Sequence, residues 1–321
     1  MNTQVIFHDI QAFLKEYPQG VIILYGPTAS GKSSLSLELG AMFAHIQQQI
    51  EVISADSRQI YRLMDIGTDK LALKHRSKMP HYGFDVVDPD ERYTAYQRQQ
   101  SAKHWIQDIQ KRWSIPLVVG GTGLYIDTLY KNFSLVDDVD PDRARREQLQ
   151  LQELQNPWSV RQELYRIDPV SAEQLHPNNL RYIIRALEIY EQSWTPKSIL
   201  AQERDPDWPV MMIHLSISKD DSLQKITNRV DEMIQDWLID EVRALLDQGY
   251  TGDFQAMNGI GYRQTLERLE TWSSDLQELK DSIVLATTRY AKRQRSWFRR
   301  YQADALDHPK TGVIYKTYQA P

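Results

Sequence analysis

The sequence predicts an α/β protein in which helices flank a core of parallel β-strands. Short apolar runs with strand-like composition alternate along the chain with longer stretches of helical spacing, the order typical of parallel sheets. One such run leads through a glycine-rich loop into a helix within residues 21–39, the order of elements found at phosphate sites. With 321 residues, 41% of them hydrophobic, the chain can form one or two domains with a full core.

The first strand, expected at Val21–Tyr25, runs into a loop at residues 26–33 that matches the motif G-x-x-x-x-G-K-[ST]. In this motif, backbone amides and the helix N-terminus surround phosphate oxygens, the lysine adds positive charge and the hydroxyl binds Mg²⁺. Lys32 and Ser33 take the last two places. The sequence therefore predicts a P-loop NTPase-like core, against the alternative of a structural turn. The residues expected to bind a diphosphate are Gly26, Thr28, Ala29, Ser30, Gly31, Lys32 and Ser33.

A second strand, expected at residues 51–55, ends at Asp56. Ligands of open α/β sheets bind beyond the carboxyl ends of the strands, so we expect Asp56 to face the phosphate site. Asp56 is a candidate active-site base or Mg²⁺ group; the alternative is a helix N-cap, a position where aspartate is common. Residues 65–70 predict a loop over this site, and residues 80–89 predict a short strand between turns.

Residues 93–113 have the spacing of a crossover helix, and residues 115–119 then form another buried strand. This strand leads into Gly120, Gly121 and Thr122. Adjacent glycines at a strand end let backbone amides approach an anion, and a threonine adds a hydroxyl donor. A glycine-rich turn alone is weak evidence, but on the same sheet edge as a P-loop it predicts a second phosphate-facing loop.

The composition changes after residue 136, where acidic residues and a proline precede a stretch rich in Gln, Glu, Leu and Arg. We predict an inserted all-helical subdomain at 137–202, with the catalytic core formed by residues 1–136 and 203–321. Its clearest helix places Arg181 and Arg185 one turn apart, which suits either a nucleic-acid contact or a solvated basic edge. Residues 210–215 then predict a return strand of the core sheet.

Apolar residues between 223 and 246 keep a helical period up to Gly249 and indicate core packing. Arg229 lies off most of this stripe, so the pattern alone makes it a surface arginine. The loop at residues 258–264 carries glycines, an aromatic residue and an arginine. It suits a contact with a nucleic-acid backbone, and a plain turn is the alternative.

A final helix is predicted from a capping-box-like start at Ser274 to the basic residues around Arg300. At about 100° per residue, its basic side chains fall on one arc and its aromatic side chains on another. In a chain of net charge -5, this local cluster indicates polyanion binding, against the alternative of a solvated face. We expect the tail after Leu306 to be peripheral. The clustered basic residues are Arg289, Lys292, Arg293, Arg295, Arg299 and Arg300.

Composition excludes several other classes of function. The chain contains no cysteine, which rules out disulfides, thiolate zinc sites and a cysteine nucleophile, and its eight histidines show no ligand-like pairing. Residues 1–17 lack the pattern of a signal peptide, and no apolar run approaches the ~20 residues of a membrane helix. We therefore expect a cytoplasmic protein that makes no membrane contact, and we expect a monomer.

The motifs in chain order resemble those of the tRNA dimethylallyltransferase family, also called tRNA isopentenyltransferase, in its bacterial type. The resemblance implies Mg²⁺-dependent transfer of a dimethylallyl group from dimethylallyl diphosphate to N6 of adenosine 37 in the anticodon stem-loop of tRNA, giving N6-isopentenyladenosine and diphosphate. The first three motifs are shared with enzymes that prenylate free adenine nucleotides, and the last three point to tRNA. The motifs are GPTASGKSSL, SADSRQIYRLMDIGTDK, VGGTGLY, NNLRYIIRALEIY, GIGYRQ and KRQRSWFRR.

The resemblance also implies residue roles. Asp56 matches the general base, Thr122 the threonine near the diphosphate bridge, and Arg229 an arginine that holds the leaving group. Lys225 stands one turn earlier, where many members have a second arginine. The residues implied to contact tRNA are Asp56, Ser57, Arg58, Gln59, Arg181, Arg185, Gly261, Tyr262, Arg263, Lys292, Arg293, Arg295, Arg299 and Arg300.

Three other functions stay open on the sequence alone. A P-loop kinase would use the same loop with ATP. An adenylate isopentenyltransferase would prenylate free AMP or ATP and would not need the basic helix. A non-catalytic RNA-binding protein would bind tRNA whether or not Asp56 and Lys32 were intact.

Overall fold

A six-stranded parallel sheet forms the centre of the protein. The computed structural model describes residues 3–137, 142–271, 275–307 and 310–320, without the side chains of residues 306 and 307. All strand pairs are parallel, and the strand order is β3-β2-β4-β1-β5-β6. The parallel α/β core predicted from the sequence is therefore confirmed. The strands are β1 (Val21–Tyr25), β2 (Ile50–Ala55), β3 (His81–Tyr82), β4 (Ile115–Gly120), β5 (Val210–Ser216) and β6 (Val313–Gln319).

Helices cover both faces of the sheet, which explains why the inner strands are continuous apolar runs. Ile22 and Leu24 of β1 pack toward α1 (Thr3–Glu16) and α2 (Lys32–His45). The alternate residues of β1 pack toward the opposite face, which is covered by the next group of helices. These are α4 (Ala95–Lys111), α5 (Gly123–Tyr130) and the 32-residue α14 (Leu276–Asp307).

A further hydrophobic cluster lies beyond the carboxyl ends of the strands. It joins residues of α11 (Lys219–Gln235), α12 (Leu238–Asp247), α13 (Tyr262–Glu270) and the first half of α14. The helical period expected between 223 and 246 is split into two helices. The split falls at Trp237, whose φ of +73° takes the backbone into the left-handed region that no helix of L-residues continues.

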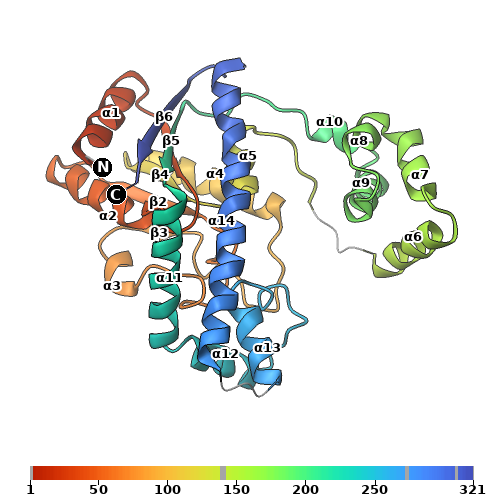
Figure 1. Ribbon diagram of the computed structural model, residues 1–321. Coiled ribbons are helices and arrows are strands. Elements are labelled where there is room, and N and C mark those ends of the chain that lie inside the picture. The colour runs from red at the N-terminus through yellow and green to blue at the C-terminus, as the bar shows by residue number, and fades with distance from the viewer. Residues whose placement is uncertain (1–2, 138–141, 272–274, 308–309, 321) are drawn as a thin grey trace.

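The inserted segment is all-helical, as predicted, and Figure 1 shows it as a lobe separate from the core. It has its own core of buried residues, including Leu149 and Leu187. Residues 138–141 lie outside the described residues, so the subdomain bounds 137–202 stay a prediction. The helices of the lobe are α6 (Arg143–Gln155), α7 (Ser159–Ile167), α8 (Pro169–Gln174), α9 (Leu180–Ser193) and α10 (Lys197–Leu200).

The tail after Leu306 is not peripheral, because β6 pairs with β5 along its whole length. The strand expected within residues 80–89 forms as the two-residue β3, preceded by the short α3 (Leu73–Arg76). The expected cap residue Ser274 lies outside the described residues, and Asp275 Oδ1 accepts the backbone N–H groups of residues 277 and 278.

Across residues 3–320, apart from the gaps at 138–141, 272–274 and 308–309, no helix is long and apolar enough to cross a membrane.

Candidate active site

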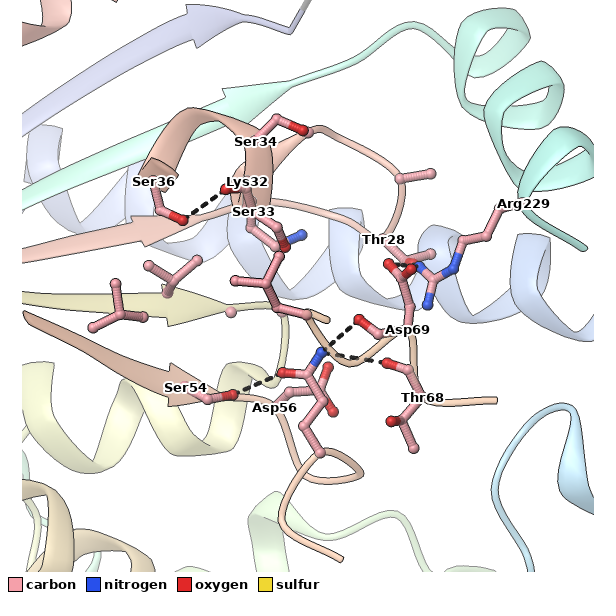
Figure 2. Close-up of a pocket in the computed structure, with 18 of the residues that line it drawn as sticks. Thr28, Lys32, Ser33, Ser34, Ser36, Ser54, Asp56, Thr68, Asp69 and Arg229 are labelled. Carbon is pink, nitrogen blue, oxygen red and sulfur yellow. Dashed lines mark hydrogen bonds and ion pairs between the residues drawn. The ribbon is translucent and has the colours of Figure 1, made fainter. Parts of the chain in front are cut away.

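A cavity of about 360 Å³, here called the phosphate cavity, opens at the carboxyl ends of the strands. The P-loop forms one wall, and its backbone turns at Gly31, where φ is +83°. Figure 2 shows Thr28, Lys32 and Ser33 on one side of the cavity, with Asp56 and Thr68 opposite. Two of the predicted phosphate-binding residues do not line it. Gly26 packs against the Leu215 carbonyl, and Ser30 is fully buried.

Lys32 lies at the end of the P-loop and bonds back to it. Its Nζ donates to the Pro27 carbonyl at 2.7 Å. Burial lowers the pKa of Lys32 to about 8, Asp56 acts in the opposite direction and Arg229 lowers the pKa further. A dianionic or trianionic phosphate ester in the cavity would therefore stabilise the charged form of Lys32 and gain from its charge.

Asp56 stands between this cavity and a second one. Its Oδ1 accepts the Arg58 backbone N–H at 2.7 Å, which closes a turn directly after β2. The alternative prediction of a helix N-cap is wrong, because the residues after Asp56 form turns and no helix begins there. Asp56 lines both cavities, so its carboxylate is available to a ligand that spans them.

The second glycine-rich loop lies beside Asp56. Thr122 Oγ1 accepts the Ser57 backbone N–H at 3.0 Å, and the Thr122 backbone N–H donates to the Ala55 carbonyl. These bonds join the ends of β2 and β4, which are neighbouring strands. Gly120 and Gly121 line the phosphate cavity, whereas the Thr122 hydroxyl is used to hold the segment after Asp56.

Arg229 reaches over the P-loop from α11 (Figure 2). Its Nη1 donates to Thr28 Oγ1 at 2.9 Å and forms an ion pair with Asp69 at 3.2 Å. The side chain is only 23% exposed, so the surface position suggested by the helical pattern is wrong. Its Nε is buried without a partner among the described residues. Lys225, one turn earlier on α11, also lines the phosphate cavity.

The loop predicted over the site at residues 65–70 is present and is held from two sides. Gln59 Nε2 donates to the carbonyls of Thr68 and Asp69 at 3.3 and 3.2 Å. From the other side, the carboxylate of Glu241 accepts the backbone N–H groups of residues 65, 66 and 67. The role of Glu241 could not be predicted from the sequence, because an acidic residue in the first turn of α12 is typical of a helix N-terminus.

Several residues of the predicted tRNA surface have partners within the protein. Tyr262 is 1% exposed, and its hydroxyl donates to Glu241 at 2.6 Å. Gly261 is buried too, whereas Arg263 is exposed. The GIGYRQ motif therefore supports the loop over the site with its tyrosine and presents only its arginine to solvent. Gln59 likewise uses its amide to hold that loop.

The second cavity, of about 440 Å³ and here called the adjoining cavity, shares a wall with the first. Part of it is apolar, formed by Ile226, Val230 and Met233 of α11 with Ile260 and Ile283. Four arginines besides Arg229 also line it, which suits a ligand with both a flat apolar part and negative charge. The residues common to both cavities are Thr28, Asp56, Thr68, Arg229 and Tyr290. The arginines are Arg58, Arg263, Arg289 and Arg293.

The C-terminal helix presents a row of exposed basic side chains, here called the basic row and formed by Arg289, Lys292, Arg293 and Arg299. The other two predicted members are held by the protein. Arg295 donates to Ser222 of α11 at 3.2 Å, so it lies at a helix interface. Arg300 stacks on Trp297 at 4.0 Å from the ring centroid and lies 3.6 Å from Asp127.

The insert arginines also differ from each other. Arg181 is exposed on α9, as a tRNA contact requires. Arg185 forms an ion pair with Glu188 at 3.2 Å, and Glu188 is only 3% exposed. Arg185 is itself partly buried. Its burial and this ion pair give Arg185 a structural role inside the lobe, which the sequence pattern did not indicate.

The phosphate cavity contains oxygen ligands that suit Mg²⁺. Mg²⁺ in phosphate sites usually keeps several waters and takes one or two protein oxygens together with the substrate phosphates. The Ser33 hydroxyl lines the phosphate cavity together with the carboxylates of Asp56, Asp69 and Glu232. Among the described residues there is no cluster of three or more His, Asp or Glu that would hold a metal ion alone. The donor set therefore fits a metal ion that binds together with a diphosphate.

The fold and the site define a P-loop protein whose phosphate cavity opens onto a second, arginine-lined cavity. A family model described as IPP transferase matches residues 59–301. The chain belongs to this family. A protein of Pseudothermotoga lettingae named tRNA dimethylallyltransferase is 40% identical over 286 residues, covering 89% of this chain and 88% of its own.

Solved structures agree with this assignment. The full-length tRNA isopentenylpyrophosphate transferase of Bacillus halodurans is 33% identical, with a TM-score of 0.63 over 94% of this chain and 90% of its own. A eukaryotic dimethylallyltransferase acting on tRNA is 27% identical, with a TM-score of 0.75 over 93% of this chain and 74% of its own. The P-loop NTPase-like fold is confirmed.

Proposed function

We propose that this chain transfers a dimethylallyl group from dimethylallyl diphosphate to N6 of adenosine 37, beside the anticodon of tRNA. The products are N6-isopentenyladenosine and diphosphate. The observation that carries this proposal is the position of Asp56 on the wall shared by the two cavities. A diphosphate held by the P-loop and a base held in the adjoining cavity would meet at this carboxylate.

The P-loop together with Lys32 and Arg229, here called the cradle, supports departure of the diphosphate. As the allylic C–O bond breaks, negative charge grows on the bridging oxygen and must be neutralised. Lys32 and Arg229 supply fixed positive charge around Thr28 of the P-loop. Mg²⁺, held by Ser33 together with the diphosphate, would supply additional charge neutralisation there.

Asp56 would act on the acceptor. Adenine N6 is a weak nucleophile because its lone pair is delocalised into the ring. In the proposed step, N6 forms the new C–N bond, the C–O bond breaks with its electron pair leaving on the diphosphate, and an N6 proton passes to Asp56. General-base effects of this kind contribute about 10²- to 10⁴-fold in rate.

The adjoining cavity and the basic row support tRNA as the acceptor. A base must leave its stack to reach an enclosed carboxylate, and unpaired loop bases are the least costly to extrude. The exposed cations of α14 lie on the same helix as Tyr290, which is common to both cavities. A cytoplasmic location and a monomeric state, both predicted from the sequence, are part of this proposal.

Mass spectrometry tests the proposal most directly. Unmodified tRNA would be incubated with the purified protein, Mg²⁺ and dimethylallyl diphosphate, with AMP and ATP as parallel acceptors. We expect an isopentenyl mass gain that maps to the adenosine beside the anticodon. Gain on AMP or ATP alone would assign the enzyme to free nucleotides, and ATP hydrolysis or phosphoryl transfer without any gain would favour a kinase.

A further inference from the structure

Gln294 is a buried polar residue within the most basic stretch of the chain. It lies on α14 between Arg293 and Arg295, yet it is only 5% exposed. Its helical phase places it with Tyr290 and Trp297, on the side of α14 that packs against the core. A polar side chain in this position needs hydrogen-bond partners inside the protein.

Those partners are the two phosphate-facing loops. The backbone N–H of Thr28 donates to Gln294 Oε1 at 2.8 Å, and Gln294 Nε2 donates to the Gly121 carbonyl at 2.8 Å. A carboxamide suits this position because its oxygen accepts one bond while its nitrogen donates the other. One residue of α14 therefore connects the P-loop with the loop that follows β4.

The local packing at Gly121 is tight around this amide. A Cβ added to Gly121 would lie 2.3 Å from Gln294 Nε2, so glycine at this position lets the amide reach the carbonyl. On the P-loop side, Thr28 also accepts the hydrogen bond from Arg229. Fixing Thr28 and Gly121 thereby fixes the residues next to them, including Thr122.

We propose that Gln294 is a positioning residue that sets the spacing between the two loops around the diphosphate. Its carboxamide holds the P-loop curled at Thr28 and holds the second loop at Gly121, so that both loops meet the same ligand. This inference rests on the proposed function, in which the phosphate cavity binds dimethylallyl diphosphate.

Two variants test the role. Gln294→Glu keeps an acceptor for Thr28 but replaces the donor to Gly121 with an oxygen, which repels the carbonyl and adds negative charge. Gln294→Met has a similar size and loses both bonds. Gln99→Glu is the matched control, because Gln99 is 4% exposed and donates to the Thr128 and Phe133 carbonyls away from the phosphate cavity.

The measurements are calorimetric binding of dimethylallyl diphosphate with Mg²⁺, KM for each substrate, kcat and the melting temperature. We expect Gln294→Glu to weaken dimethylallyl diphosphate binding and raise its KM by about 10-fold or more, with a smaller rise in Gln294→Met and KM for tRNA unchanged. Gln99→Glu should lower the melting temperature and leave the diphosphate affinity as in the wild type.

Wild-type diphosphate affinity in either folded Gln294 variant would overturn the proposal and leave Gln294 with a structural role only. If Gln294→Glu does not fold, Gln294→Met decides the matter by the same measurement. Failure of the proposed function would look different. A wild-type protein that binds dimethylallyl diphosphate but modifies no tRNA would refute the acceptor, while the binding comparison would still decide the role of Gln294.

Discussion

The cradle and the basic row both present positive charge, but the protein holds this charge in different ways. Lys32 and Arg229 are partly buried and hydrogen-bonded to the P-loop, so their positions are fixed before a ligand arrives. Lys292 and Arg293 of the basic row are exposed. Fixed cations stabilise charge at one atom, whereas exposed cations attract a polyanion over a distance. The difference indicates a division between chemistry and tRNA binding that substitutions can test.

The largest effect is expected at Asp56. Asp56→Asn keeps the oxygen that accepts the Arg58 N–H but removes the basic carboxylate, so the fold of the turn should survive. We expect the single-turnover rate with bound tRNA to fall by about 10²- to 10⁴-fold, with tRNA affinity unchanged. Rapid-quench measurement of isopentenyl transfer provides the rate. A near-normal rate would refute the base assignment; Asp108→Asn, on the outer helix α4, is the control.

The next effect concerns the charge of Lys32. Because burial lowers its pKa to about 8, the free enzyme loses this charge as pH rises through 8. The diphosphate binds the charged form, so affinity should be full below pH 8 and fall above it by at most about tenfold per pH unit. Calorimetry across pH 7 to 10 would measure this profile. Lys32→Arg, which stays charged throughout, should flatten it; an unchanged profile in that variant would assign the titration to another group.

The basic row should affect tRNA alone. Arg293→Ala is expected to weaken tRNA binding and to reduce the slope of log K against log salt by about one, since one phosphate contact is lost. Dimethylallyl diphosphate binding should not change. Filter binding at several salt concentrations gives the slope. Arg295→Ala is the matched control, because Arg295 lies on the same helix but donates to Ser222. Weaker diphosphate binding in Arg293→Ala would contradict the division.

Much of the core could be predicted because its signals are local. The inner strands are buried on both faces, so Val21–Tyr25 and residues 115–119 are unbroken apolar runs bounded by turns. The P-loop carries its conformation in its own glycine and lysine pattern. In contrast, β6 lies at the sheet edge and has polar residues such as Lys316 and Gln319. Its sequence therefore lacks the apolar run that indicates a buried strand.

The rest of the site depends on contacts between segments far apart in the chain. Arg229 lies off the apolar stripe of α11, and only the packing of that helix over the P-loop turns it toward Thr28. Gln294 and Glu241 form hydrogen bonds to backbone groups of loops. Because nearly every residue type has these backbone groups, the sequence of the loops does not indicate such partners. One signal was available: Gln294 is a polar residue in helical phase with Tyr290 and Trp297.

The smallest effects are expected in the insert, where Arg181 and Arg185 separate binding from stability. Burial would raise the pKa of Glu188, but Arg146 and Arg185 outweigh it and hold that pKa below its ordinary range. The stability from these ion pairs is present above the unfolded-state pKa of glutamate and is lost as pH falls through the lower folded-state value. Arg185→Ala should therefore lower the melting temperature at neutral pH, with a difference from wild type that shrinks under acid.

Arg181→Ala should leave the melting temperature unchanged, because Arg181 is exposed, and should weaken tRNA binding only slightly. Thermal unfolding at pH 7 and at acidic pH, with tRNA binding measured on the same samples, compares the two variants. Equal melting temperatures at pH 7 with equal losses of tRNA affinity would mean that both arginines contact tRNA. In that case both arginines of α9 would bind tRNA as the basic row does. The difference between fixed and exposed cations would then apply to the core alone and not to the insert.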